Sequence, residues 1–109
     1  MYERSRHFIN CHIAGFTYYD GLDVINDLEI GTPVSLKADP ENPYDSNAVA
    51  LYLNDTKLGY VPREKNSYLS DILYFGHGDI LEAKISQRNL EADTERQFRI
   101  TVKIKDNRK

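Results

Sequence analysis

The feature of this sequence that most constrains its fold is a series of short segments in which apolar and polar residues alternate. Two of them lie late in the chain, at 80–87 and 97–105, and each places every second residue on one apolar face. This alternation is typical of β-strands that are buried on one side. No apolar run approaches the length needed to cross a membrane. We therefore expect a domain built mainly from short strands.

Four earlier segments fit the same interpretation. These strands are expected at 7–14, 34–38, 47–53 and 57–61. The segment 47–53 is apolar on both faces, which is typical of a central, covered strand. Because Asn54-Asp55-Thr56 has the composition of a hairpin turn, we expect 47–53 and 57–61 to pair antiparallel.

One helix is expected between the fourth and fifth strands, at about residues 63–75. Pro62 suits a helix start, and Gly76 follows its end. The apolar residues that recur at helical spacing on its inner side are Tyr68, Leu69, Ile72 and Leu73. A weaker apolar spacing indicates a short helical turn near 22–28.

Five to six short strands with one helix predict a mainly β fold, and specifically a small OB-like or SH3-like β-barrel. The 109 residues allow a single domain, 1–109, with its core at about 8–104.

Charge and cysteine content narrow the classes of function. Fourteen basic against 17 acidic residues give a net charge of −3, which argues against wrapping long nucleic acid but allows a few nucleotides to be held by stacking. The charge is uneven, because 96–109 is basic and 20–29 is acidic. Cys11 is the only cysteine, so we expect a buried, inert thiol and no disulfide. With no signal peptide in view, a cytoplasmic location is expected.

The sequence contains no recognisable set of catalytic groups. No glycine-rich phosphate loop precedes a helix, and no Ser or Cys has the context of a nucleophile elbow. Asp39, Glu41 and Asp45 are close in sequence, but their loop lacks the glycine of a cation-binding loop, so a solvated turn is expected. We predict no enzyme activity, no cofactor and no metal.

Two tyrosine-bearing loops offer the clearest chemistry. Tyr18 and Tyr19 follow a strand end, and Tyr44 lies in a loop stiffened by Pro40 and Pro43. Aromatic rings on rigid supports stack on bases with little loss of entropy.

Polar groups flank these aromatic rings. Asp45, beside Tyr44, adds a hydrogen-bond acceptor, and Arg63 adds a cation after the strand that ends near Tyr60. An alternative is that Asn42 and Asp45 only stabilise their own turn through Asx bonds.

Three ordered motifs carry a resemblance to a known family. They are Ala14-Gly15-Phe16-Thr17-Tyr18-Tyr19-Asp20-Gly21, Asp39-Pro40-Glu41-Asn42-Pro43-Tyr44-Asp45-Ser46-Asn47-Ala48-Val49 and Leu58-Gly59-Tyr60-Val61-Pro62-Arg63. With this spacing the chain resembles the HIRAN domain over about residues 8–104. This module occurs at the N-terminus of DNA translocases and alone in many bacterial proteins.

The resemblance implies an OB-like barrel that captures a free 3′ end of single-stranded DNA. It places Tyr18 and Tyr44 against the terminal bases and has Asp45 accept a hydrogen bond from the 3′-hydroxyl. The remaining residues that it implies in DNA binding are Tyr19, Asn42, Tyr60 and Arg63. Thr17 stands where DNA-binding members carry an arginine, which removes one cation from the first motif.

Three hypotheses follow for function. The leading one is a non-catalytic module that binds single-stranded DNA 3′ ends and serves DNA repair or remodelling, with DNA-processing enzymes as possible protein partners. The second is a protein-interaction or oligomerisation domain that has lost DNA binding, which Thr17 and the net charge motivate. The third is a hydrolytic role, either in the chain itself or as an accessory domain to a hydrolase or helicase supplied by another chain.

Overall fold

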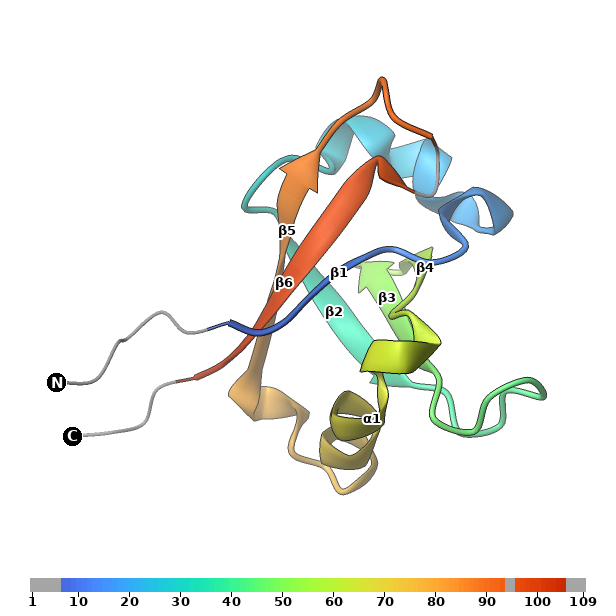
Figure 1. Ribbon diagram of the computed structural model, residues 1–109, viewed down its shortest axis with the longest axis vertical. Coiled ribbons are helices and arrows are strands. Elements are labelled where there is room, and N and C mark those ends of the chain that lie inside the picture. Colours follow the sequence, from blue (N-terminus) through green and yellow to red (C-terminus); the bar gives the residue numbers. More distant parts are fainter. Residues whose placement is uncertain (1–6, 94–95, 106–109) are drawn as a thin grey trace, which may run out of the picture.

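The computed structural model describes residues 7–93 and 96–105, in which six strands form one curled sheet (Figure 1). All neighbouring strands are antiparallel, in the order β1-β6-β5-β2-β3-β4. The strands are β1 (His7–His12), β2 (Pro33–Ala38), β3 (Val49–Leu53), β4 (Thr56–Tyr60), β5 (Leu81–Arg88) and β6 (Phe98–Ile104). The expected mainly β fold of the small-barrel type is confirmed, including the hairpin of β3 and β4.

The sheet curls because β2 changes partner along its length. Pro33 and Val34 pair with β5, whereas 35–38 pair with β3. The ends of β1 and β4 then meet, where Ala14 and Tyr60 exchange two backbone hydrogen bonds of 2.8 and 2.9 Å. A Cβ on Gly59 would lie 2.4 Å from the Ala14 carbonyl oxygen, so this closure requires glycine at that position.

The inward side chains of the strands and of the segments that connect them form one core. Its largest fully buried members include Phe16, Ile13, Leu51, Leu58, Leu69, Ile85, Phe98 and Ile100. Two positions of β6 differ from the expected alternation. Ile104 is 44% exposed, because it lies beyond Lys103, the last residue of β6 that β1 pairs. Thr101 is buried on the outer face, where Asn10 donates a hydrogen bond to its hydroxyl.

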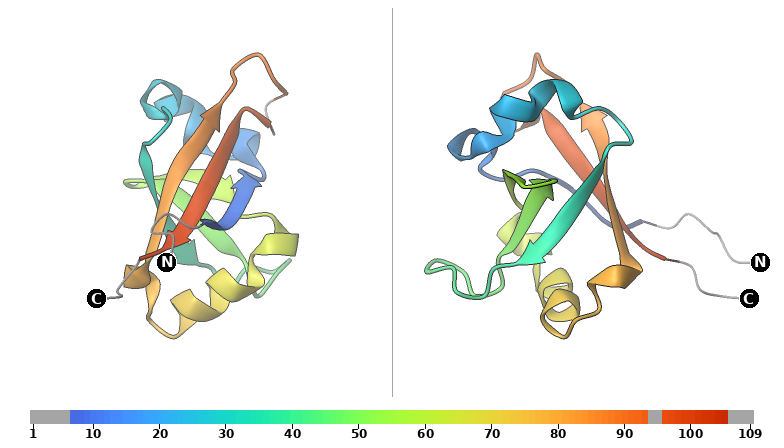
Figure 2. Two further views of the ribbon diagram at one scale, coloured as in Figure 1. Left: turned by 60° about the vertical axis from the view of Figure 1, so that its left-hand side comes forward. Right: turned by 180° about the vertical axis from the view of Figure 1, so that it is seen from behind.

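Short helices connect the strands at both ends of the barrel (Figure 2). They are the 3-10 helices η1 (Phe16–Tyr18), η2 (Asp20–Asp27), η3 (Arg63–Lys65) and η4 (Gly78–Ile80), with the α-helix α1 (Ser67–Tyr74). The turn expected near 22–28 is part of η2. No helix in the described part of the chain is long and apolar enough to span a membrane.

The helix expected at 63–75 is present but divided into two parts. Its first turn is the separate 3-10 helix η3, and the α-helix begins only at Ser67. The buried side of α1 is centred on Leu69 and Ser70. Tyr68 lies outside that side and is 71% exposed, so its predicted place among the inward residues is wrong.

Candidate functional site

The two tyrosine-bearing loops lie on the same side of the molecule. The first loop (residues 15–19) includes η1 and leads from β1 into η2, and the second loop (residues 39–48) joins β2 to β3. Figure 1 and both views of Figure 2 place them beyond the same edge of the barrel, with η3 and β4 between them. The fold therefore brings together segments that are at least twenty residues apart in sequence.

The first loop is fixed by apolar packing. Gly15 has a left-handed backbone with φ of 73°, and its carbonyl accepts a hydrogen bond from the Tyr18 amide at 2.9 Å. Phe16 is buried, with its ring centroid 5.1 Å from that of Phe98. A Cβ on Gly21 would lie 2.3 Å from the Phe16 ring, so the aromatic side chain fills the space beneath the loop. Tyr18 is 83% exposed above this support.

The second loop is fixed by hydrogen bonds. The Asn42 side-chain oxygen accepts from the backbone amides of Tyr44 at 2.9 Å and of Asp45 at 3.2 Å. Asp45 Oδ1 accepts in turn from the Asn47 amide at 2.9 Å. Both residues therefore stabilise their own turn, as the alternative interpretation predicted. Tyr44 is 85% exposed at the tip of this framework.

The Asp45 carboxylate is held in place from outside its loop as well. Its Oδ2 accepts a hydrogen bond of 2.8 Å from the Asn66 side chain, and Arg63 Nε lies 3.6 Å away. The hydrogen bond from the Asn47 amide, then that from Asn66, and the nearby Arg63 together lower the pKa of Asp45. Arg63 also donates to the Tyr44 carbonyl and stays largely exposed.

Tyr60 connects the two loops. The rings of Tyr19 and Tyr60 meet edge to face, with centroids 5.6 Å apart. The Tyr60 hydroxyl donates to Asp39 at 2.8 Å and accepts from the Asn42 side chain at 3.3 Å. A continuous series of contacts thus runs from Tyr19 through Tyr60 to Asn42, the residue that shapes the second loop. Tyr19 and Tyr60 are half-buried supports, unlike Tyr18 and Tyr44.

Lys57, like the Asn66 that holds Asp45, is a site residue that the sequence does not predict. Its ammonium group donates to the Tyr60 hydroxyl at 2.6 Å and lies 4.6 and 4.3 Å from the ring centroids of Tyr19 and Tyr60. Partial burial lowers the pKa of Lys57. The hydrogen bond to Tyr60 and the proximity of the tyrosine hydroxyls outweigh that effect, so the pKa lies above the ordinary lysine value.

An irregularity in β4 explains why Lys57 was missed. Residues three apart on a regular strand face opposite sides. In β4 the register shifts opposite Leu51 and Tyr52, so that Gly59 pairs with Leu51 but Lys57 pairs with Tyr52. This bulge brings Lys57 and Tyr60 to the same side. The run of residues in β4 gives no local signal for it.

Other reactive groups lie apart from the loops. Cys11 is buried, and burial raises the pKa of its thiol to about 11, which agrees with the inert thiol expected from the sequence. In residues 7–93 and 96–105, no three side chains of the His, Cys, Asp and Glu types gather as a metal-binding group.

Known proteins share this sequence and fold. Residues 7–105 match the HIRAN domain family. Over 63 residues the chain is 36% identical to helicase-like transcription factor of rabbit (Oryctolagus cuniculus), and equally to that of human. The match covers 57% of this chain but 6% of each of those proteins, so the chain spans only a small part of their length.

Two solved structures have a similar fold. A protein from Lactobacillus plantarum aligns with a TM-score of 0.75 and 21% identity, over 88% of this chain and 90% of its own. The HIRAN domain of human HLTF aligns with a TM-score of 0.62 and 23% identity, over 90% of this chain and 76% of its own. Since the family match extends over almost all described residues, the chain belongs to the HIRAN domain family.

Proposed function

We propose that this domain is a non-catalytic module that captures the free 3′ end of single-stranded DNA. The observation that carries the proposal is the set of contacts joining the two loops through Tyr60, which holds two exposed tyrosines, a carboxylate and two cations on one side of the barrel. Each group has a counterpart in the chemistry of a DNA end: bases, a hydroxyl and phosphates.

The exposed rings of Tyr18 and Tyr44 supply the stacking surfaces. Each ring projects from a loop whose backbone is already fixed, so little conformational entropy is lost when a base packs against it. Stacking of a base on an aromatic side chain contributes about 1–3 kcal/mol. Tyr19 and Tyr60 act below them as supports.

Asp45 distinguishes a 3′ end from a strand that continues. Its carboxylate is oriented by Asn47 and Asn66, yet two oxygens offer about four acceptor positions, so capacity remains for a hydroxyl donor. A terminal 3′-hydroxyl donates there, whereas a continuing strand has no hydroxyl at that atom. A 3′-phosphate places negative charge against the carboxylate, which disfavours binding.

Lys57 and Arg63 supply the positive charge. Arg63 is exposed beside the second loop, and Lys57 lies against Tyr19 near the first. Lys57 thereby provides a cation near the loop in which Thr17 replaces the arginine implied by the family. Two or three phosphate contacts give a shallow salt dependence, with a log–log slope of about −1 to −2, which is compatible with a net charge of −3.

The module binds DNA, and the catalytic chemistry is left to other domains or other chains. A relative of this chain is named helicase-like transcription factor, and this chain corresponds to only 6% of it. Catalytic activity on DNA in repair or remodelling would then be supplied by a DNA-processing enzyme, on the same or another chain, within the cell interior.

A protein-binding role is the second candidate, and a specific surface favours it. Tyr74 and Phe75 at the end of α1 are 67% and 71% exposed, with ring centroids 5.1 Å apart. Exposed aromatic pairs are common in protein interfaces. A pull-down whose partners survive nuclease treatment, with no oligonucleotide binding at low salt, would favour this candidate.

The test of the proposed function compares three DNA ligands by fluorescence anisotropy: a short oligonucleotide with a 3′-hydroxyl, the same oligonucleotide with a 3′-phosphate, and a circle. We expect the first to bind most tightly. We also expect Tyr44→Ala and Tyr18→Ala each to lose about 1–3 kcal/mol of binding while the domain stays folded. Equal binding of all three ligands would refute end recognition, and unfolding of Tyr44→Ala would show that Tyr44 belongs to the core.

A further inference from the structure

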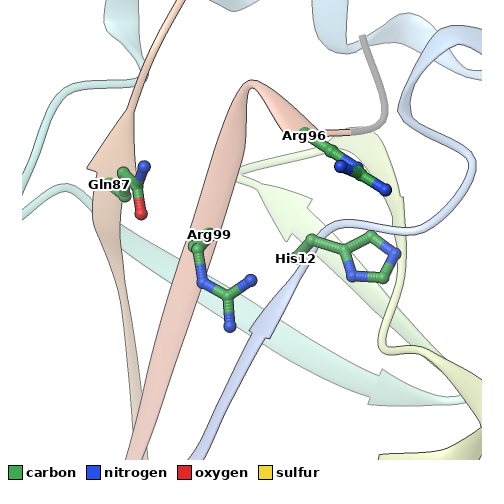
Figure 3. Close-up of a pocket in the computed structure, with 4 residues that line it drawn as sticks. All are labelled: His12, Gln87, Arg96 and Arg99. Atoms are coloured by element: carbon green, nitrogen blue, oxygen red, sulfur yellow. The ribbon is translucent and has the colours of Figure 1, made fainter. Parts of the chain in front are cut away.

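A basic pocket lies on the outer face of the sheet and is not used by the proposed function. It has a volume of about 800 Å³ and is lined by His12, Gln87, Arg96 and Arg99 (Figure 3). This volume is in the range of ligand pockets, roughly 300–1,000 Å³. Strand register explains the cluster, because Arg99 of β6 pairs with His12 of β1 on one side and with Gln87 of β5 on the other.

Arg99 is held in place by a neutral partner. Its Nε and Nη2 donate to the Asn10 side-chain oxygen at 3.1 and 2.9 Å, and Asn10 donates in turn to the buried Thr101 hydroxyl at 3.3 Å. An amide orients the guanidinium without neutralising its charge. A fixed arginine with open donors matches the geometry of a phosphate group.

The pocket concentrates positive charge in an acidic protein. Among the residues that the structure describes, the ion pair found is Arg63–Asp45, and no carboxylate is paired with His12, Arg96 or Arg99. The chain as a whole carries a net charge of −3. Like charges placed together destabilise the free protein, and an anionic ligand would relieve that repulsion.

Contacts connect the pocket to both tyrosine-bearing loops. Phe98, the neighbour of Arg99, packs against Phe16 beneath the first loop. On the other side, Lys65 donates at 3.3 Å to the carbonyl of Asn10, the residue that orients Arg99. Lys65 belongs to the same 3-10 helix as Arg63 of the second loop. The basic side chains of Arg63 and Lys65 therefore lie between the second loop and the pocket, with the acidic Glu64 between them in the same helix.

We propose that this pocket is a second phosphate site, which holds the backbone of the DNA strand whose 3′ end lies at the two loops. The inference rests on the proposed function for the identity of its ligand. Arg96 and Arg99 contact phosphate oxygens, and His12 and Gln87 lie beside them as further hydrogen-bonding groups. The strand runs from the loops past Lys65 to the pocket, so the ligand is a single strand of several nucleotides, longer than the terminal pair.

The test uses oligothymidylates of three and twelve nucleotides, both with a 3′-hydroxyl, titrated at several salt concentrations. The native chain should bind the longer one more tightly and with a steeper salt dependence. In the double variant Arg96→Gln/Arg99→Gln, binding of the longer strand should fall about tenfold or more. For that strand, the slope of the logarithm of the binding constant against the logarithm of the salt concentration should become shallower by about 1.4, which corresponds to two phosphate contacts at about 0.7 each. The three-nucleotide ligand should bind as before.

Lys37→Gln is the matched control, because it removes an exposed cation of β2 that lies over Tyr52, outside the pocket and both loops. It should leave the slope for the longer strand close to the native one. If the Arg99 change disturbs folding, Arg96→Gln alone should still reduce the slope by about 0.7.

The outcomes separate the two proposals. If the folded double variant binds the longer strand with the same salt dependence as the native chain, the second site is overturned. A reduced slope in that variant, together with equal native binding of 3′-hydroxyl and 3′-phosphate ends, would refute end recognition but support the second site.

Discussion

The first and second loops each hold one exposed tyrosine, but they fix it by different means. Beneath Tyr18 the first loop has a buried phenylalanine, which packs against Phe98. Beneath Tyr44 the second loop has the Asn42 side chain, which accepts hydrogen bonds from two backbone amides. One support is therefore part of the domain core, and the other is a polar framework at the surface.

This difference determines what a substitution can disturb. Apolar packing beneath the first loop is continuous with the barrel, so a change there alters folding and site together. The hydrogen bonds that Asn42 accepts in the second loop span only two or three residues and lie near the surface, so a change there alters the site and leaves most of the barrel intact. Of the two supports, only the one beneath Tyr44 can therefore be removed while most of the fold stays intact.

The largest expected effect comes from removing the apolar support. Phe16→Ala should lower the free energy of unfolding by about 3–5 kcal/mol, because it leaves a cavity between the loop and Phe98. Urea denaturation measures this loss, and the rate at which a thiol reagent labels the buried Cys11 provides a second readout. DNA binding should fall with it.

Tyr18→Ala in the same loop is the control. Its side chain is largely exposed, so stability should stay within about 0.5 kcal/mol of the native value. A Phe16→Ala protein with the native urea midpoint would break the comparison, because the first loop would then not depend on packing.

A smaller effect is expected from removing the polar support. Asn42→Ala should lower the free energy of unfolding by about 1–2 kcal/mol, since the amides of Tyr44 and Asp45 lose their acceptor but can turn to water. Affinity for a 3′-hydroxyl oligonucleotide should fall severalfold in protein that is still folded, because both residues lose their fixed positions. Isothermal titration and thermal melting measure the two quantities.

Ser46→Ala is a control within the same loop, at an exposed position outside the hydrogen bonds around Asn42, and it should bind DNA nearly as the native chain does. If Asn42→Ala unfolds the barrel as Phe16→Ala does, the two supports are equivalent and the comparison fails.

The local parts of this structure were predictable from the sequence. Alternation of apolar residues located the strands, and the composition of 39–46 located the second loop, because both patterns depend on neighbouring residues. The exposure of Tyr18 and Tyr44 also agreed with the proposal that loop tyrosines face outward.

Groups that meet only through the closed sheet were not predictable. Asn66 reaches Asp45 across 21 residues, and Arg99 reaches Asn10 across 89. Lys57 contacts Tyr60 because of the bulge in β4 and the close approach of β1 and β4 at Gly59, and neither feature has a signal in the sequence. Such contacts depend on strand register, and register is fixed by the whole barrel and not by any one segment.

The smallest expected effect concerns the charge of Asp45. It tests whether the polar framework of the second loop holds this carboxylate. Hydrogen bonds from the Asn47 amide and Asn66, with Arg63 nearby, lower the pKa of Asp45 in the folded state below the ordinary value of 3.8. A lowered pKa stabilises the fold above the ordinary pKa, and this contribution is lost as the pH falls through the lower, folded value. The difference in melting temperature between the native chain and Asp45→Asn should therefore be constant from pH 8 to about pH 5 and should shrink only in more acidic solution. A difference that has already vanished at pH 6 would show that the carboxylate is not held by these donors. No comparable acid-dependent loss is expected for Tyr18→Ala, because the first loop is fixed by the uncharged side chain of Phe16.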